Sequence, residues 1–476
     1  MLGLLANHLR VSLPMWVPRF NGQTQPVYLM IADAIERDIA SAKLSQGDRL
    51  PTLKELAEAL KVTPGTVGRA YDEASKRGLV VGEVGRGTFV SPKAQASPRP
   101  QAVYSPVPRA ETGQVDLSII KPNDSGTADW LREAVVDLAE APGLATVLDY
   151  TTDGGHAVHK EAGAIWLQNR LPEANWQQVV LTAGAQHGLL VAIGSLSKND
   201  DLILCEELCY SGIISLAHSL GRRLKGVQID AFGIVPESLR ELCKAHRPKL
   251  LICVTTHHNP GNSIMPDARR AEIAEIAREY DLFIVDDDIY GFLETEIPTT
   301  PLSAFAPERS IYLTSLSKCI LPALRIGYLY APPETLSRLS SMVRSSIWMP
   351  SPLMAQLASN LINSGKGLEL VDVQQREAAL RQTMAADILG AYEVRGQANS
   401  YHIWLELPQP WTSDEFTYLA RAHGVAVVSG SQFLAERTGS TRGVRIALMS
   451  PSREELHFAL TKLASLLASP EPRLFY

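Results

Sequence analysis

The chain has 476 residues, of which 45% are hydrophobic and 20% are charged. A chain of this length and composition can bury one large core and a smaller second one. Its formal net charge of −6 excludes a protein coated in basic surface, so any contact with nucleic acid depends on a few placed side chains. The first residues lack the basic start and apolar length of a signal peptide, and no apolar run of about 18 residues follows. We therefore expect a soluble, cytoplasmic protein with no membrane partner.

Five cysteines are scattered through the chain, an odd number that is typical of a reducing compartment and not of a disulfide framework. Two of them, Cys205 and Cys209, lie close together, but no further Cys or His follows at zinc-type spacing. Structural burial is favoured over metal binding, and we expect no metal. The full set is Cys205, Cys209, Cys243, Cys253 and Cys319.

Residues 1–23 show no periodicity and are predicted to form a disordered tail, with Met15 as an alternative start to Met1. Beyond the tail, apolar residues recur every four positions and predict a helix from Val27 to about Ala42. A second short helix is expected around residues 53–60.

Thr63 is expected to cap a third helix, with Pro64 at its first position, where the missing N–H does no harm. Its apolar face predicts four core residues, Val67, Ala70, Tyr71 and Ala74. The outward positions near its start are those that a recognition helix offers to a major groove, namely Gly65, Thr66, Gly68 and Arg69. Residues 79–90 then predict a hairpin with a glycine-rich tip that carries Arg86.

Three helices and a hairpin also occur in modules that bind no DNA, so periodicity alone leaves both interpretations open. The strings Arg49-Leu50-Pro51-Thr52 and Gly85-Arg86-Gly87-Thr88-Phe89-Val90 resemble the GntR family of winged helix-turn-helix domains. This resemblance implies a DNA-binding domain over residues 24–92. The DNA contacts that it implies are Arg49, Thr66, Arg69 and Arg86.

Residues 93–115 carry several prolines and almost no apolar periodicity. Such a composition favours an extended, semi-rigid segment. We predict a linker that acts as a passive tether, with a binding site of its own as the alternative.

The remainder of the chain alternates short apolar runs with helical stretches. Continuous apolar runs of this length predict an α/β layer structure with a mainly parallel sheet. Ligand chemistry then belongs at the carboxyl ends of the strands. The predicted strands cover residues 179–182, 202–204, 250–254, 282–285, 311–313 and 326–329.

Three motifs follow such runs. Residues 182–186 open a helix, whose free N–H groups suit an anion. The carboxylates of Asp286, Asp287 and Asp288 need a cation, which is either a protonated ring nitrogen or a magnesium ion. Lys318 lies between two serines, with Arg325 nearby, and offers an amine for a Schiff base beside an anion-binding set. Together these are the parts that pyridoxal phosphate requires.

The stretch from about Asp116 to Ala468 resembles the aspartate aminotransferase family of fold type I, and the whole chain resembles the MocR subfamily of GntR regulators. The resemblance implies a body over residues 116–476, made of a large α/β domain and a small C-terminal α+β domain at about 390–476. It also implies pyridoxal 5'-phosphate as the cofactor.

The resemblance assigns a role to each site residue. Lys318 forms the Schiff base, Asp287 pairs with the pyridine nitrogen, and both act in catalysis together with Tyr290. Asn259 and Tyr290 hydrogen-bond the phenolic oxygen, and Tyr210 stacks on the ring. The phosphate is held by Ala185, Gln186, Ser315, Ser317 and Arg325.

Two more residues follow from the resemblance. Arg445 binds the carboxylate of an amino compound as a bidentate pair. Tyr150 contributes to the phosphate site of a neighbouring subunit, which implies a homodimer. Of His257 and His258, at most one can face the pocket if they lie on a strand, and a structural role is favoured. Trp404 is expected in the core of the small domain.

The resemblance implies a transcriptional regulator that binds a double-stranded DNA operator and senses an amino compound, or pyridoxal phosphate itself, through Lys318. The alternative is an active aminotransferase that acts on an amino acid and whose DNA-binding head is secondary. The complete set of head residues at Arg49, Thr66, Arg69 and Arg86 favours the regulator.

Overall fold

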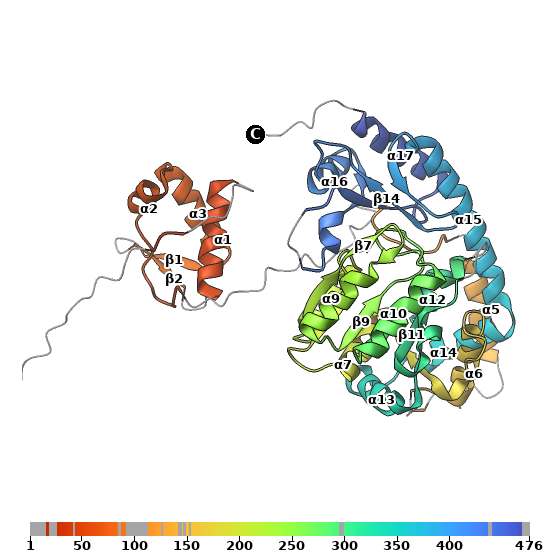
Figure 1. Ribbon diagram of the computed structural model, residues 1–476. Helices are drawn as coiled ribbons and strands as arrows, with labels where there is room; N and C mark the ends of the chain where they lie inside the picture. Colours follow the sequence, from red (N-terminus) through yellow and green to blue (C-terminus); the bar gives the residue numbers. More distant parts are fainter. Residues whose placement is uncertain are drawn as a thin grey trace, which may run out of the picture. The chain divides into compact units, whose positions relative to one another are not determined.

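The computed structural model describes residues 16–18, 26–40, 43–83, 87–91, 113–124, 127–140, 145, 149–151, 154–294, 299–436 and 440–468. The chain divides into two compact units, residues 1–105 and 106–476 (Figure 1). Within the described residues no helix is both long and apolar enough to cross a membrane.

The described part of the first unit contains three helices and a hairpin, as the sequence predicts. The helices are α1 (Val27–Ala40), α2 (Leu53–Leu60) and α3 (Pro64–Lys76), and β1 (Val80–Glu83) pairs antiparallel with β2 (Gly87–Val90). The four residues predicted for the core face of α3 are all buried in one apolar cluster with α1 and α2.

Side-chain caps determine where two of these helices begin. Thr52 and Glu55 form a capping box at the start of α2, in which each side chain bonds the backbone N–H of the other residue. Thr63 accepts a hydrogen bond from the N–H of Thr66, and Pro64 occupies the first turn of α3. The predicted start of α3 is confirmed.

The tail prediction differs from the structure at one point. The indole Nε1 of Trp16 donates a hydrogen bond to Asp38 Oδ2 at 2.8 Å, and Lys43 Nζ lies 3.0 Å from the same oxygen. Trp16 therefore lies against α1, because its ring and its N–H both find partners there. The predicted tail outside residues 16–18, and most of the predicted linker, lie outside the described residues.

A mainly parallel sheet forms the centre of the second unit. Its strand order is β4-β12-β11-β10-β9-β5-β6, and only β12 runs antiparallel to its neighbours. All six predicted runs are strands of this sheet. The strands are β4 (Val179–Thr182), β5 (Leu202–Glu206), β6 (Arg223–Val227), β9 (Leu250–Cys253), β10 (Phe283–Asp287), β11 (Ser310–Ser315) and β12 (Gly327–Tyr330).

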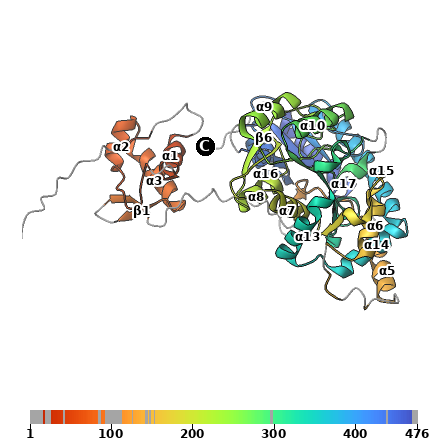
Figure 2. The same cartoon turned by 60° about the horizontal axis from the view of Figure 1, so that its bottom comes forward.

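Helices cover both faces of the sheet, which explains why its strands read as continuous apolar runs. One face packs against α7 (Ala185–Leu196), α8 (Ser211–Ser219) and α13 (Pro333–Ile347). The other packs in part against α9 (Pro236–His246) and α10 (Asp267–Glu279) (Figure 2).

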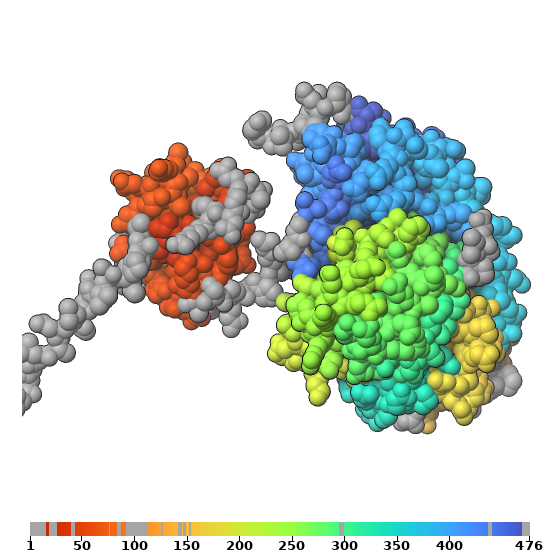
Figure 3. All heavy atoms as spheres, in the orientation of Figure 1, coloured from red at the N-terminus to blue at the C-terminus, as the bar shows by residue number. Residues whose placement is uncertain are grey.

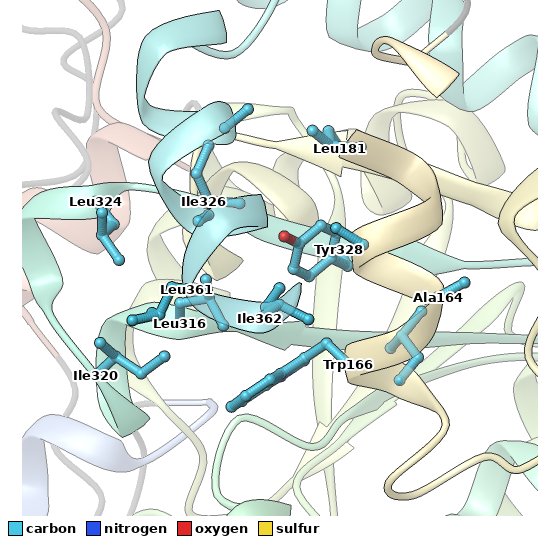
Figure 4. Packing of buried hydrophobic residues seen from close by; sticks show 14 of the residues in the cluster. Ala164, Trp166, Leu181, Leu316, Ile320, Leu324, Ile326, Tyr328, Leu361 and Ile362 are labelled. Carbon is cyan, nitrogen blue, oxygen red and sulfur yellow. The ribbon is translucent and has the colours of Figure 1, made fainter. Parts of the chain in front are cut away.

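A further apolar cluster joins the sheet to α6 (Ala157–Leu167) and α14 (Pro352–Asn363). Figure 4 shows Trp166 of α6 and Leu361 of α14 in this cluster, together with Tyr328 of β12. Beside it lies α5 (Thr127–Glu140).

The small domain is built on a four-stranded antiparallel sheet of order β13-β14-β17-β16. In Figure 3 the atoms of the C-terminal residues, in blue, lie beside those of the large domain, in green. Trp404 is buried against Phe433 in its core, as predicted. The strands are β13 (Glu393–Arg395), β14 (His402–Glu406), β16 (Val428–Ser429) and β17 (Gly443–Ala447), and the helices are α15 (Lys366–Leu389), α16 (Ser413–Ala422) and α17 (Arg453–Leu467).

The chain enters this unit through the small domain. Here β3 (Val115–Asp116) pairs parallel with β15 (Val425–Ala426). Residues 117–120 then continue toward the large domain, where the Lys318 Nζ donates to the carbonyl of Ile120.

Candidate functional site

The predicted site residues of the body gather where the parallel strands of the large sheet end. Asp287 is the last residue of β10, and Lys318 belongs to α12 (Leu316–Cys319), directly after β11. Tyr210 precedes α8, after β5, and Ala185 begins α7, after β4. This is the edge of an α/β sheet at which ligands bind.

The three adjacent carboxylates have different partners. Asp286 accepts hydrogen bonds from Thr255 Oγ1 at 3.2 Å and from the N–H of Ser303 at 2.9 Å. Asp288 accepts from Arg170 Nε at 3.1 Å and from the Tyr312 hydroxyl at 2.9 Å.

Asp286 and Asp288 are thus both engaged by protein donors. Among the described residues, no group of three or more His, Cys, Asp or Glu side chains is arranged to hold a metal ion. The five cysteines are all buried and unbridged. Asp287 is the remaining carboxylate of the three, and it lies close enough to Lys318 for the two charges to interact.

Asp287 is buried, and its Oδ1 has no hydrogen-bond partner among the residues that the structure describes. Burial raises the pKa of this carboxyl to about 7, and the neighbouring charges of Asp286 and Asp288 add to the effect. A cation placed against Asp287 would restore the ionised form. A protonated pyridine nitrogen fits this requirement.

Lys318 presents an amine that loses its proton easily. Burial lowers its pKa to about 8, and the positive charges of Arg445 and Arg325 contribute to the shift, while Asp287 opposes them. A neutral amine is the nucleophilic form. The side chain is therefore prepared to attack an aldehyde near neutral pH.

An anion site lies beside Lys318. Gly184 precedes α7 with φ 84°, and a Cβ there would lie 2.8 Å from the Arg325 guanidinium. The first-turn N–H groups of α7, including those of Ala185 and Gln186, have no acceptor within the helix. Arg325 Nη1 lies 3.5 Å from Ser317 Oγ, and Ser315 precedes α12. These groups together fit a phosphate.

A cluster of polar side chains lies between the small and the large domain of the body. Arg445 of β17 donates to Asn259 Oδ1 at 3.0 Å and to the carbonyl of Ser118. Tyr290 is buried, and burial raises its pKa, with Arg445, Asp287 and Tyr210 as its charged or polar neighbours. The structure thus brings Asn259, Tyr290 and Arg445 together, with Asp287 nearby.

Tyr150 lies at the surface of its own chain. Its side chain is 74% exposed, and its ring packs edge-on against Trp348 at 5.9 Å between centroids. An exposed aromatic side chain in this position is available to a second copy of the chain.

The expectation that His257 and His258 lie on a strand is wrong. The strand β9 ends at Cys253, and His257 has φ 48°, a backbone conformation that no strand contains. His257 Nε2 lies 3.0 Å from Glu294 Oε1. His258 Nδ1 accepts from the N–H of Gly261 at 3.2 Å, and burial lowers its pKa to about 4, so this ring is neutral and holds the loop.

Sequence reasoning missed Arg170 and His187. Arg170, just after α6, pairs with Asp288, and His187 in the first turn of α7 bonds Ser346 of α13. Both partners are more than 100 positions away in the chain, at separations of 118 and 159. No local pattern reports such contacts.

In the first unit, two of the predicted DNA contacts are exposed basic residues. Arg69 of α3 stacks over the Tyr28 ring at 4.3 Å. Arg49 forms an antiparallel bridge with Phe89 of the hairpin. Thr66 is half-buried, with its hydroxyl 2.9 Å from that of Thr63. Arg86 lies outside the described residues.

Two family descriptions match the chain. Residues 27–90 match the bacterial regulatory proteins of the gntR family. Residues 113–463 match aminotransferase class I and II. The two matches fall on the first and the second compact unit respectively.

Relatives with the same two parts cover almost the whole chain. The HTH-type transcriptional regulator YdeF of Bacillus subtilis (strain 168) is 27% identical over 95% of this chain and 96% of its own. The regulator YdcR of Escherichia coli (strain K12) is 24% identical over 85% and 92%. The mitochondrial kynurenine/alpha-aminoadipate aminotransferase of Bos taurus is 32% identical, but over 40% of this chain and 48% of its own.

Solved structures show the same fold in the body. Pyrococcus horikoshii kynurenine aminotransferase superposes with a TM-score of 0.70 at 22% identity, over 75% of this chain and 91% of that one. LysN, the alpha-aminoadipate aminotransferase of Thermus thermophilus, gives 0.68 at 24% identity, over 77% and 95%. Its structure contains N-(5'-phosphopyridoxyl)-L-leucine.

The family match over most of the chain and the fit of Lys318, Asp287 and the anion site agree on one cofactor, pyridoxal phosphate. The chain therefore belongs to the aminotransferase class I and II family and carries a gntR-family DNA-binding domain ahead of it, the organisation of the MocR regulators.

Proposed function

We propose that this protein is a pyridoxal-phosphate-dependent transcriptional regulator of MocR type, whose head binds operator DNA and whose body senses an amino compound. One observation carries the proposal. The same chain holds a winged helix-turn-helix with exposed Arg49 and Arg69, and a body in which Lys318, Asp287 and Arg445 lie close together. Relatives that share both parts over most of their length are named transcriptional regulators.

The head would bind DNA through α3 and the hairpin. The N-terminal end of α3 is the part of a recognition helix that reaches base edges. Thr66 lies in its first turn, and Arg69 is exposed one turn further on. Arg49 lies beside the hairpin, and Arg86 would add a phosphate or minor-groove contact.

The body would hold the cofactor with residues from several strand ends. Its aldehyde would be attached to Lys318, its ring nitrogen would face Asp287, and Tyr210 would stack on the ring. Asn259 and Tyr290 would hydrogen-bond the ring oxygen. The phosphate would lie on Ala185, Gln186, Ser315, Ser317 and Arg325. When bound, the cofactor supplies an electrophilic carbon that exchanges amines.

Arg445 would bind the carboxylate of the amino compound. Its guanidinium already lies against Asn259 and the carbonyl of Ser118, so it is held in place before a ligand arrives. A ligand carboxylate would alter these bonds between the small and large domains. Sensing requires that the ligand favour one DNA-binding state over the other.

The regulator would act as a homodimer in the cytoplasm. Tyr150 is exposed on its own chain and would complete the phosphate site of a second copy. Two heads on one dimer predict an operator with paired half-sites.

Footprinting on the upstream region of the protein's own operon tests the proposal. We expect protection of two half-sites, with a pattern or an affinity that changes when pyridoxal phosphate or an amino acid is added. Absence of protection under every condition would contradict it. A comparison of DNA affinity between the cofactor-free and loaded protein would show whether pyridoxal phosphate itself is the signal.

The second candidate is an aminotransferase with a secondary head. It is favoured by the complete set of Lys318, Asp287 and Arg445, which lie close together. Mixing the loaded protein with a panel of amino acids and a keto acid separates the two candidates. Steady multiple turnover would favour the enzyme, whereas a single exchange without turnover supports the regulator.

A further inference from the structure

His187, which is not among the residues predicted to bind the cofactor, stabilises the start of α7. The backbone N–H of Ala183 donates to His187 Nδ1 at 3.0 Å. Gly184, which precedes the helix, has no side chain to cap it. His187 therefore reaches back from the first turn and fixes the backbone just before the helix, much as the glutamate does in a capping box.

The proton arrangement of the histidine is determined by its neighbours. Because Nδ1 accepts a hydrogen bond, the neutral ring carries its proton on Nε2 and donates to Ser346 Oγ at 2.8 Å. Ser346 in turn donates to the carbonyl of Met342 at 2.7 Å. Burial lowers the pKa of His187 to about 4, and Arg325 adds to the effect, so the ring is neutral at ordinary pH.

Ala183 is held on its other side by the phosphate-binding arginine. Its carbonyl accepts from Arg325 Nη2 at 3.0 Å, while its N–H is held by His187. Only Gly184 separates Ala183 from Ala185 and Gln186, the residues that would contact the phosphate. The position of their N–H groups therefore depends on this anchored residue.

We propose that His187 is a positioning residue for the cofactor phosphate, which fixes the N-terminus of α7 to the last turn of α13 through Ser346. The inference rests on the proposed function, because it concerns the same phosphate site. It adds a residue that contacts no ligand atom. Through Ser346 it also joins the site to α13, whose C-terminal cap Trp348 packs against the exposed Tyr150.

A direct test compares two ligands that differ in the phosphate alone. The full-length protein, freed of cofactor, is titrated with pyridoxal 5'-phosphate and with pyridoxal, and the absorbance change gives both dissociation constants. A general loss of structure would weaken both ligands, whereas a displaced phosphate site would weaken the first one alone. The ratio of the two constants is the readout.

Three variants separate the contacts of the histidine. His187→Ala removes both hydrogen bonds and should weaken pyridoxal phosphate about threefold to tenfold, with pyridoxal unchanged. His187→Asn places an amide oxygen near the position of Nδ1 and should restore much of the loss. Ser346→Ala keeps the bond to Ala183 and should give a smaller loss. The matched control is Ser345→Ala, a neighbouring exposed serine whose hydroxyl bonds the carbonyl of Ser341.

The inference is overturned if His187→Ala retains the wild-type ratio, or if it weakens both ligands equally. It is also overturned if Ser345→Ala lowers the ratio as much as Ser346→Ala does. If the wild-type protein binds neither aldehyde, the proposed function itself fails. If the wild-type protein binds pyridoxal phosphate and the variants give the results above, only the inference about His187 fails, so the two failures are distinguishable.

Discussion

Arg445 donates a hydrogen bond to Asn259 at 3.0 Å, and this bond joins the small domain to the loop that follows β9 of the large domain. Both residues are buried. A ligand carboxylate that binds Arg445 competes with Asn259 for the guanidinium. Asn259, which is proposed to bind the ring oxygen of the cofactor, would therefore lose a hydrogen bond when an effector binds Arg445.

The first prediction concerns Arg445→Lys. Lysine keeps the charge but cannot form two parallel hydrogen bonds with a carboxylate. We expect the affinity for amino acids to fall about tenfold to hundredfold, with the affinity for pyridoxal phosphate nearly unchanged. Absorbance titrations of the loaded and the cofactor-free protein measure the two affinities. A parallel loss of both would contradict the assignment of Arg445 to the effector.

The second prediction concerns Asp287→Asn and the stability of the cofactor-free protein. Burial raises the pKa of Asp287 to about 7, whereas an aspartate in an unfolded chain has a pKa of about 4. The folded protein thus holds this proton more tightly than the unfolded chain does. The carboxyl therefore lowers the free energy of unfolding as pH rises from about 4 through 7.

The asparagine variant has no such pH-dependent cost, so it should be more stable than the wild type at pH 8, by on the order of 4 kcal/mol. At a pH of about 4 the two should be nearly equal. Urea unfolding at both pH values measures this difference. The same substitution should weaken cofactor binding, because the ring nitrogen loses its ionic partner. Equal stability of the two proteins at the higher pH would show that burial of the Asp287 carboxylate carries no cost.

The third prediction concerns the rate at which pyridoxal phosphate becomes attached to Lys318. Since the pKa of this amine is lowered to about 8, the rate should rise with pH and level off above about 8, where a free lysine would still be mostly protonated. Mass spectrometry after borohydride reduction follows the attachment. Lys318→Ala should give no attachment at this position.

Arg445→Gln tests whether the charge of Arg445 lowers the pKa of Lys318. Arg445 is the largest charge contribution that lowers the pKa of Lys318. Removing this charge should shift the midpoint of the rate profile to higher pH. A midpoint that does not move would show that burial alone controls the amine.

The sequence predicts the large sheet well because its five inner strands and one of its two edge strands, β4, are almost entirely buried. Six runs of consecutive apolar residues mark six strands, whereas β6 escapes notice. Its residues 223–227 include Arg223, Lys225 and Gly226, and the strand lies at an edge of the sheet. An edge strand needs no continuous apolar run, so the pattern that finds the others is missing.

The same reasoning explains what could be predicted of the site. Asp287 and Lys318 each lie within five residues of the end of an apolar run, so both can be found from the local sequence as residues near the carboxyl end of a strand. His187 and Arg170 contribute through contacts with distant segments, which only the folded chain brings together. The strand prediction for His257 and His258 is wrong because the apolar run before them gives no sign of where it ends.

The last prediction concerns the head. Arg69 is exposed on α3 and stacks over Tyr28, which holds its guanidinium in one direction without neutralising it. Arg69→Ala should weaken operator binding by about 1 to 3 kcal/mol if the arginine reads a base, and should relax specificity at that base.

Arg49→Ala should weaken binding to all sequences alike and lower the salt dependence by about one counterion, since a residue beside the hairpin contacts phosphate. Fluorescence anisotropy with operator and scrambled duplexes, at several salt concentrations, measures both effects. Lys61→Ala, in the turn between α2 and α3, is the control for loss of a positive charge. If all three variants lose the same affinity at the same salt slope, binding depends on net charge and the assignment of α3 as the recognition helix is wrong.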